Sequence, residues 1–177
     1  MKIVALLLLL LSFSVHARTP YAEQVDCRLT PLACNIYAEA RGEPLLGQLA
    51  VAFTTLNRLQ HESFPKTLRG VVFETGAFSW TKSGHVVPVR EKDQWEAAKL
   101  IAKFAYRLYV TDPAMYRAMD PTYGSLFYHA HYVRPDWKSN RYLTARIGNH
   151  LFYSEDKFGN PTNHNQRPFG AFFLLRG

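Results

Sequence analysis

The sequence predicts a mainly helical α+β domain with a small β element late in the chain. Apolar residues recur at helical spacing in segments 31–41, 45–60 and 93–110. Segments 125–131 and 146–153 are short, rich in aromatic residues and strand-like. The 177 residues contain no internal repeat and no Ser/Gly-rich linker, so we expect one domain with one core.

The first predicted helix runs from Pro31 to about Arg41. Thr30 and Pro31 are typical of an N-cap and a first helical position. Gly42 fits the left-handed residue that closes many helices. Pro44 prevents a simple continuation and suits the first turn of the next helix.

The remaining elements follow from periodicity and from Gly and Pro. We expect the second helix over about 45–60 and a short third helix over about 66–73. Residues 76–81 lack a helical period and should form a loop or short strand. Residues 81–90 should form a surface loop, and 93–110 is the clearest long helix.

The N-terminus has the pattern of a secretory signal peptide. A basic start at Lys2 is followed by an apolar run and an A-x-A-like end at Ala17. The run is shorter than a comfortable membrane span. We therefore expect residues 1–17 to be removed, leaving 18–177 as one periplasmic or secreted domain. The alternative is an uncleaved segment, which would be the only membrane attachment that we expect.

The chain is basic, with a formal net charge of +7. A positive balance favours an anionic partner such as nucleic acid, anionic lipid or an acidic cell-wall polymer. The Lys and Arg residues are scattered and form no block, so a generally basic surface explains the charge equally well. We therefore expect no dedicated nucleic-acid site.

The chain has two cysteines, Cys27 and Cys34. On one continuous helix this spacing would put them about 10 Å apart, too far for a disulfide bond. Pro31 begins the predicted helix, however, so Cys27 precedes it and the chain can fold back. In an oxidising compartment a bridge is then possible, and two unpaired buried thiols are the alternative.

Glu39 is the most informative candidate for chemistry. It shares a helical face with Leu32 and Ile36, one turn before the predicted helix ends. Burial and the negative end of the helix dipole both disfavour a carboxylate and should raise its pKa. A carboxyl group kept protonated near neutral pH can act as a general acid. The alternative is a structural acid paired with Arg41 or Arg58.

Three histidines offer a different chemistry. His129, His131 and His150 lie in the strand-like segments, and alternation puts His129 and His131 on one face, as in many zinc sites. No H-E-x-x-H motif or cysteine ligand pair accompanies them. We therefore expect ordinary hydrogen-bonded histidines, with no metal and no other cofactor.

At the segment Tyr-Ala-Glu-Ala-Arg-Gly-Glu-Pro, residues 37–44, the chain resembles the SleB/CwlJ-type cell wall hydrolases. The resemblance extends over about residues 30–153, through pieces that occur in the same order. The main ones are Phe78-Ser79-Trp80, Phe127-Tyr128-His129-Ala130, Pro135-Asp136-Trp137 and the run from Ile147 to Tyr153.

The resemblance implies a lysozyme-like α+β fold and cleavage of peptidoglycan glycan strands, in several members by lytic transglycosylation. It places the catalytic acid on Glu39. One departure is Ala77, where the family usually has Gln, so a hydrogen bond to substrate is missing there or supplied elsewhere. The residues that it implies along the substrate groove are Phe78, Ser79, Trp80, Tyr128 and His129.

The leading hypothesis is a monomeric lytic transglycosylase that cleaves the MurNAc-β-1,4-GlcNAc bonds of peptidoglycan. Glu39 would act first as acid and then as base, because no second carboxylate is well placed. Glu43 and Arg41 would support the site beside the acid. Three alternatives stay open: a hydrolytic N-acetylmuramidase, a metal-dependent amidase using the three histidines, and a non-catalytic binding protein for cell wall or nucleic acid.

Overall fold

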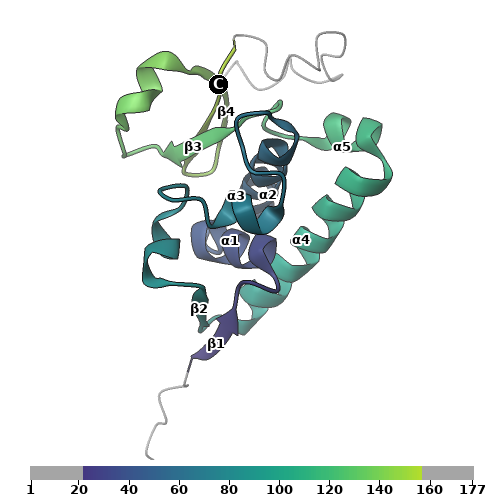
Figure 1. Cartoon of the computed structure of the whole chain (residues 1–177), viewed down its shortest axis with the longest axis vertical. Helices are drawn as coiled ribbons and strands as arrows, with labels where there is room; N and C mark the ends of the chain where they lie inside the picture. The colour runs from purple at the N-terminus through teal and green to yellow at the C-terminus, as the bar shows by residue number, and fades with distance from the viewer. Residues whose placement is uncertain (1–21, 157–177) are drawn as a thin grey trace, which may run out of the picture.

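The structure is a computed structural model that describes residues 22–156. The α-helices of this range are α1 (Pro31–Ala40), α2 (Leu45–Gln60), α3 (Leu68–Val72), α4 (Lys92–Thr111) and α5 (Pro113–Met119). Its strands are β1 (Glu23–Asp26), β2 (Val86–Val89), β3 (Phe127–Ala130), β4 (Tyr142–Ile147) and β5 (His150–Ser154). Two short 3-10 helices are η1 (Ser79–Ser83) and η2 (Asp136–Asn140). The helices form the centre, with one small sheet at each end (Figure 1), so the predicted α+β class is confirmed.

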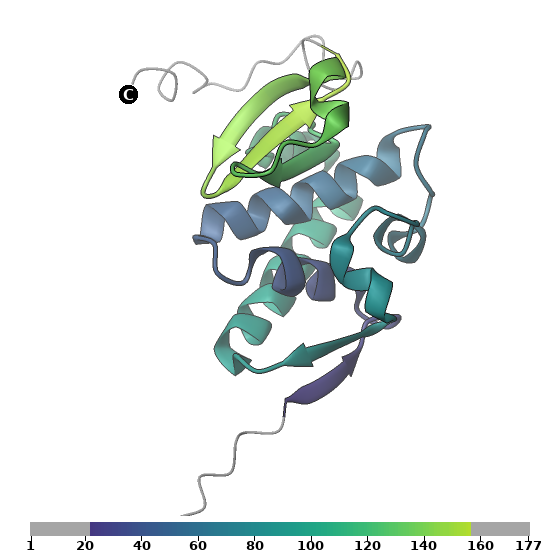
Figure 2. The same ribbon diagram turned by 90° about the vertical axis from the view of Figure 1, so that its left-hand side faces the viewer.

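The main core lies where α1 and α2 pack against α4 (Figure 2). Ile36 of α1, Phe53 and Leu56 of α2 and Ala105 of α4 are almost fully buried. The ring of Phe53 stacks on Tyr116 of α5 with 4.8 Å between ring centroids. Burial of these apolar faces explains why the three long helices formed where the periodicity predicted them.

The bounds of α1 to α4 agree with the predictions to within one or two residues, whereas α5 was not predicted. The end of α1 differs in its geometry. Gly42 was expected to be left-handed, and that expectation is wrong, because Gly42 is not among the positive-φ glycines. Arg41 keeps a helical φ of −59°, and the turn closes through a hydrogen bond of 2.9 Å from the Glu43 amide to the Ala40 carbonyl. A continued right-handed turn needs no left-handed residue.

The expectation of a surface loop over 81–90 is also wrong. Its second half is β2, which pairs antiparallel with β1 in a two-stranded sheet. Val87 and Val89 alternate inward and are buried. The partner strand precedes the first helix by sequence, so no local pattern in 81–90 announces the pairing.

A disulfide bond joins Cys27 and Cys34, whose Cα atoms are 5.7 Å apart. Cys27 follows β1, and its amide donates to the His85 carbonyl over 2.8 Å. Both cysteines are fully buried. The bridge therefore fastens the first turn of α1 to the two-stranded sheet.

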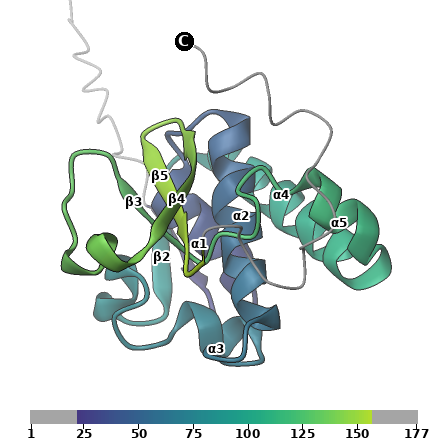
Figure 3. The same cartoon turned by 90° about the horizontal axis from the view of Figure 1, so that it is seen from above.

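The late β element is a three-stranded antiparallel sheet with the order β3-β5-β4. Segment 146–153, expected to be one strand, is a hairpin in which Gly148 and Asn149 turn the chain between β4 and β5. Gly148 has a φ of +56°, a conformation suited to glycine in tight turns. The sheet lies over α2 (Figure 3), and Ala50 of α2 packs against Phe152.

Within residues 22–156, no helix is long and apolar enough to span a membrane. The predicted signal peptide, 1–17, lies outside the described residues.

Candidate active site

Glu39 lies on α1 and faces the three-stranded sheet. Its side chain is partly buried, and the Tyr128 hydroxyl of β3 donates a hydrogen bond of 3.3 Å to Glu39 Oε2. Burial raises the pKa of Glu39, and this effect outweighs the lowering by the Tyr128 hydrogen bond and the positive charge of Arg58. The direction predicted from the helical face is confirmed.

Arg58 of α2 is the buried cation beside this acid. Its Nε donates to the Leu126 carbonyl over 2.8 Å, and its guanidinium lies 5.0 Å from the centre of the Phe78 ring. Burial lowers the pKa of Arg58. Among the described residues Glu39 forms no ion pair within 4.0 Å, and Arg41 instead pairs with Glu91 at 3.6 Å. Arg58 therefore acts on Glu39 through its field.

A polar chain fixes the wall of the site one helical turn before Glu39. The indole nitrogen of Trp80 donates to Asn35 Oδ1 over 2.9 Å, and Asn35 Nδ2 donates to Thr55 Oγ1 over 3.0 Å. Asn35 and Thr55 are fully buried, so these bonds hold Trp80 against α1. Asn35 was not expected in the site, although an amide four residues before Glu39 on an apolar face was a usable signal.

The three residues of segment 78–80, which were expected to line the groove, differ in their exposure. Phe78 is only 4% exposed and packs against Arg58 and Tyr128, so it supports the position of these two side chains. Ser79 is exposed at the start of η1, and Trp80 is partly exposed. Ala77, at the position usually held by Gln, lies in the turn before them, where its amide donates to the Glu74 carbonyl.

His129 lies on the face of β3 opposite Tyr128, since neighbouring strand residues point to opposite sides. Its ring stacks on Tyr153 at 5.2 Å and hydrogen-bonds the Tyr153 hydroxyl over 3.1 Å. The structure thus places His129 in a buried aromatic cluster and not beside Glu39. The described residues hold no group of three or more His, Cys, Asp or Glu side chains suited to a metal.

Glu43 lies in the α1–α2 turn, as expected, but its carboxylate binds the β4–β5 hairpin and not Arg41. Asn149 donates to it twice, from the backbone amide and from Nδ2, each over 2.9 Å. His150 Nδ1 lies 4.0 Å from Glu43 Oε1. The Glu43 side chain is 9% exposed, so it is a buried tie between the helices and the sheet that carries Tyr128.

Because Gly148 has no side chain, it leaves room for the Glu43 carboxylate. A Cβ on Gly148 would lie 1.9 Å from Glu43 Oε2, and the φ of +56° disfavours any L side chain. We expect Gly148→Ala to lower the free energy of unfolding by about 2 kcal/mol or more, through backbone strain and loss of the tie.

Gly42→Ala is the matched control in the same motif. A Cβ there meets nothing within 4 Å, and Gly42 has no positive φ. We expect it to change the free energy of unfolding by less than about 1 kcal/mol. Urea titration of both variants measures the difference, and equal costs would contradict the role given to Gly148.

A desolvated carboxylic acid, with a phenol donor and a buried cation beside it, is an arrangement that can serve general acid–base catalysis. The chain belongs to the cell wall hydrolase family: the model described as Cell Wall Hydrolase matches residues 42–153. That match begins after Glu39.

The relatives agree with the family. The chain is 34% identical to a spore cortex-lytic enzyme of Bacillus cereus over 126 residues, 68% of this chain and 42% of that protein. It is 35% identical to the one of Bacillus subtilis over 132 residues, 72% of this chain and 37% of that protein. The chain therefore spans less than half the length of these relatives.

Solved structures agree with the lysozyme-like fold. The catalytic domain of the Bacillus cereus SleB protein matches with a TM-score of 0.54 at 33% identity, over 70% of this chain and 86% of that one. The catalytic domain of the germination-specific lytic transglycosylase SleB from Bacillus anthracis matches with a TM-score of 0.55 at 33% identity, over 70% and 90%.

Proposed function

We propose that this protein is an exported lytic transglycosylase that cleaves the MurNAc-β-1,4-GlcNAc bonds of peptidoglycan strands and uses Glu39 as its acid and base. The observation that carries the proposal is a partly buried Glu39 in direct hydrogen-bond contact with Tyr128, and burial raises the pKa of this acid. Membership of the cell wall hydrolase family supports the substrate, and the predicted signal peptide supports export to the periplasm or beyond.

The reaction needs two proton transfers, and Glu39 takes part in both. Glu39 gives its proton to the glycosidic oxygen as the bond to the anomeric carbon breaks. The 6-hydroxyl of the same MurNAc then bonds to that carbon, and Glu39 accepts the hydroxyl proton. The products are a GlcNAc end with a new hydroxyl and a 1,6-anhydro MurNAc end, without water being consumed.

The surroundings of Glu39 suit both halves of this cycle. Burial favours the protonated form of the acid at the start. After proton transfer, the Tyr128 hydroxyl and the positive charge of Arg58 stabilise the carboxylate. Burial also raises the pKa of Tyr128 well above its usual range, so its hydroxyl remains a donor at every working pH.

A two-carboxylate hydrolase would need a partner for Glu39. Glu43 is occupied by Asn149 and 9% exposed, so it does not serve as that partner. Glu74 is the other carboxylate whose field reaches Arg58. The single-acid mechanism therefore predicts that Glu74→Gln retains cleavage, whereas an inverting muramidase that used Glu74 would lose it.

Mass spectrometry of digested sacculi tests the function. The proposal predicts fragments that end in 1,6-anhydro MurNAc, from both the wild-type protein and Glu74→Gln. Reducing MurNAc ends would identify a muramidase, and free stem peptides would identify an amidase. Binding to sacculi without any released fragment would identify a non-catalytic wall protein.

Removing the Tyr128 hydroxyl should change the pH dependence in a defined direction. The hydrogen bond from Tyr128 lowers the pKa of Glu39, so Tyr128→Phe should raise that pKa further. The enzyme is active while Glu39 is protonated, and the alkaline limb of kcat/KM should therefore move to higher pH. A limb that stays in place, measured on the same strands, would show that Tyr128 does not set the pKa of Glu39.

A further inference from the structure

A second feature lies beside the helix that carries the acid. A pocket of about 280 Å³ lies between α1, η1 and β2. The residues that line this pocket include Ala38, Arg41, Trp80, Pro88, Arg90 and Glu91. Ala38 precedes Glu39 on α1, and Trp80 is hydrogen-bonded to Asn35 one turn earlier, so the pocket borders the candidate site.

The charges in this pocket do not cancel. Glu91 is occupied, because its carboxylate accepts a hydrogen bond from the Tyr37 hydroxyl and pairs with Arg41 at 3.6 Å. Arg41 also donates to the Ala38 carbonyl over 3.4 Å. Arg90 forms no ion pair within 4.0 Å among residues 22–156. One positive charge is therefore left over.

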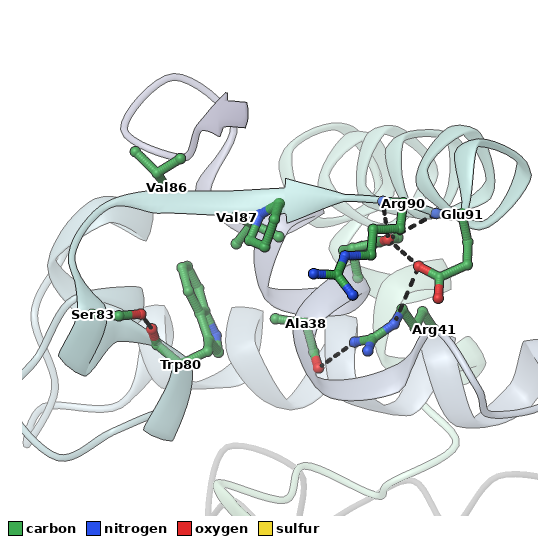
Figure 4. Close-up of a pocket in the computed structure, with 10 residues that line it drawn as sticks. Ala38, Arg41, Trp80, Ser83, Val86, Val87, Arg90 and Glu91 are labelled. Atoms are coloured by element: carbon green, nitrogen blue, oxygen red, sulfur yellow. Dashed lines mark hydrogen bonds and ion pairs between the residues drawn. The ribbon is translucent and has the colours of Figure 1, made fainter. Parts of the chain in front are cut away.

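Figure 4 shows how that charge is presented. The Arg90 side chain turns from the end of β2 into the pocket, toward Ala38, and no dashed line reaches its guanidinium. Its backbone amide is fixed by a bond of 3.0 Å to the Tyr37 hydroxyl, so the side chain starts from an anchored position. Trp80, Val87 and Pro88 supply apolar walls around it.

We infer that this pocket binds a carboxylate carried on the lactyl side chain of a MurNAc residue next to the cleaved bond, with Arg90 as its partner. A guanidinium pairs well with a carboxylate, and the apolar walls suit the methyl groups of the lactyl ether and of an attached alanine. The inference rests on the proposed function. It makes Arg90 a determinant of substrate choice that the reaction itself does not require.

Three substrates separate the possible sources of the carboxylate. The first is glycan strands with intact stem peptides, and the second is strands stripped by an amidase, which carry the lactyl carboxylate itself. The third is stripped strands with that carboxylate converted to the neutral methyl amide. The inference predicts about a tenfold lower kcat/KM on the neutral strands than on the better of the two charged ones.

Two arginine variants locate the effect. Arg90→Gln should lose the preference for charged strands. Arg107→Gln removes the same charge from the exposed face of α4 and should keep the preference, which controls for the basic surface as a whole. Arg90→Lys should restore part of the preference.

The outcomes are distinguishable from those of the proposed function. If the wild-type protein cleaves no strand, the proposed function fails. If it cleaves charged and neutral strands equally, or if Arg90→Gln keeps the preference, only the carboxylate site is overturned. A binding measurement gives a readout that does not need turnover. The Glu39→Gln variant should bind a GlcNAc–MurNAc disaccharide more tightly than the methyl amide of that disaccharide. The NMR resonance of the Trp80 indole reports the binding.

Discussion

Replacing Glu39 by Gln is expected to reduce glycan cleavage about a thousandfold or more, because one side chain supplies both proton transfers. Gln keeps the size and the hydrogen-bonding capacity of the side chain but cannot release a proton. Release of soluble fragments from purified sacculi measures the effect. Glu62→Gln, an exposed acid of the α2–α3 loop, is the matched control and should cleave at the wild-type rate.

The same variant should be more stable than the wild-type protein at neutral pH. The folded chain holds the Glu39 proton more tightly than the unfolded chain, since burial raises this pKa above its usual 4.5. Ionisation therefore costs stability as the pH rises from 4.5 through the folded-state pKa. Gln removes that cost, so the gain should vanish below the usual pKa.

These two results separate a catalytic acid from a structural one. A structural ion pair would lose stability in Glu39→Gln, because a buried charge would lose its partner. A Glu39→Gln variant that cleaves normally would remove Glu39 from the mechanism altogether.

Replacing Asp120 by Ala should produce the largest loss of stability. The buried carboxylate accepts hydrogen bonds from the amides of Thr122 and Gly124, over 2.8 and 2.7 Å, and from Asn57 Nδ2 over 2.9 Å. Asn57 in turn accepts a bond of 2.8 Å from Tyr116, so the network ties α2, α5 and the loop before β3. We expect a loss of about 4 kcal/mol in the free energy of unfolding, from several buried donors left unpaired.

Urea unfolding measures this loss, with Asp93→Ala as the control. Asp93 is exposed in the first turn of α4, where its charge favours the helix by about 0.3–1 kcal/mol. Similar costs for the two variants would show that the Asp120 network contributes little to stability.

The parts of the fold that local sequence encodes were predicted. The three long helices follow from apolar spacing and from Pro31 and Pro44, because the side chains that form each buried face lie within a few turns. The β1–β2 pairing and the β4–β5 hairpin were not predicted as such. Val86–Val89 pairs with a strand about sixty residues away in sequence. The hairpin depends on the positive φ of Gly148, and the strand-like residues on both sides of this glycine made the segment look like one continuous strand.

The candidate site was also predicted only where its geometry depends on local sequence. The face of Glu39 and the direction of its pKa follow from one helix, whereas Tyr128 came from the resemblance and lies 89 residues away in sequence. The polar chain through Asn35 and Thr55 was not foreseen, because each bond joins different helices or loops. Phe78 and His129, which the resemblance places along the groove, are both buried in the folded chain.

The most direct test of the central claim is digestion of sacculi in water enriched in heavy oxygen, followed by mass spectrometry of the new MurNAc ends. A lytic transglycosylase that uses Glu39 alone predicts 1,6-anhydro ends that carry no heavy oxygen, because the 6-hydroxyl and not water attacks the anomeric carbon. Reducing MurNAc ends with one heavy oxygen atom each would contradict the account.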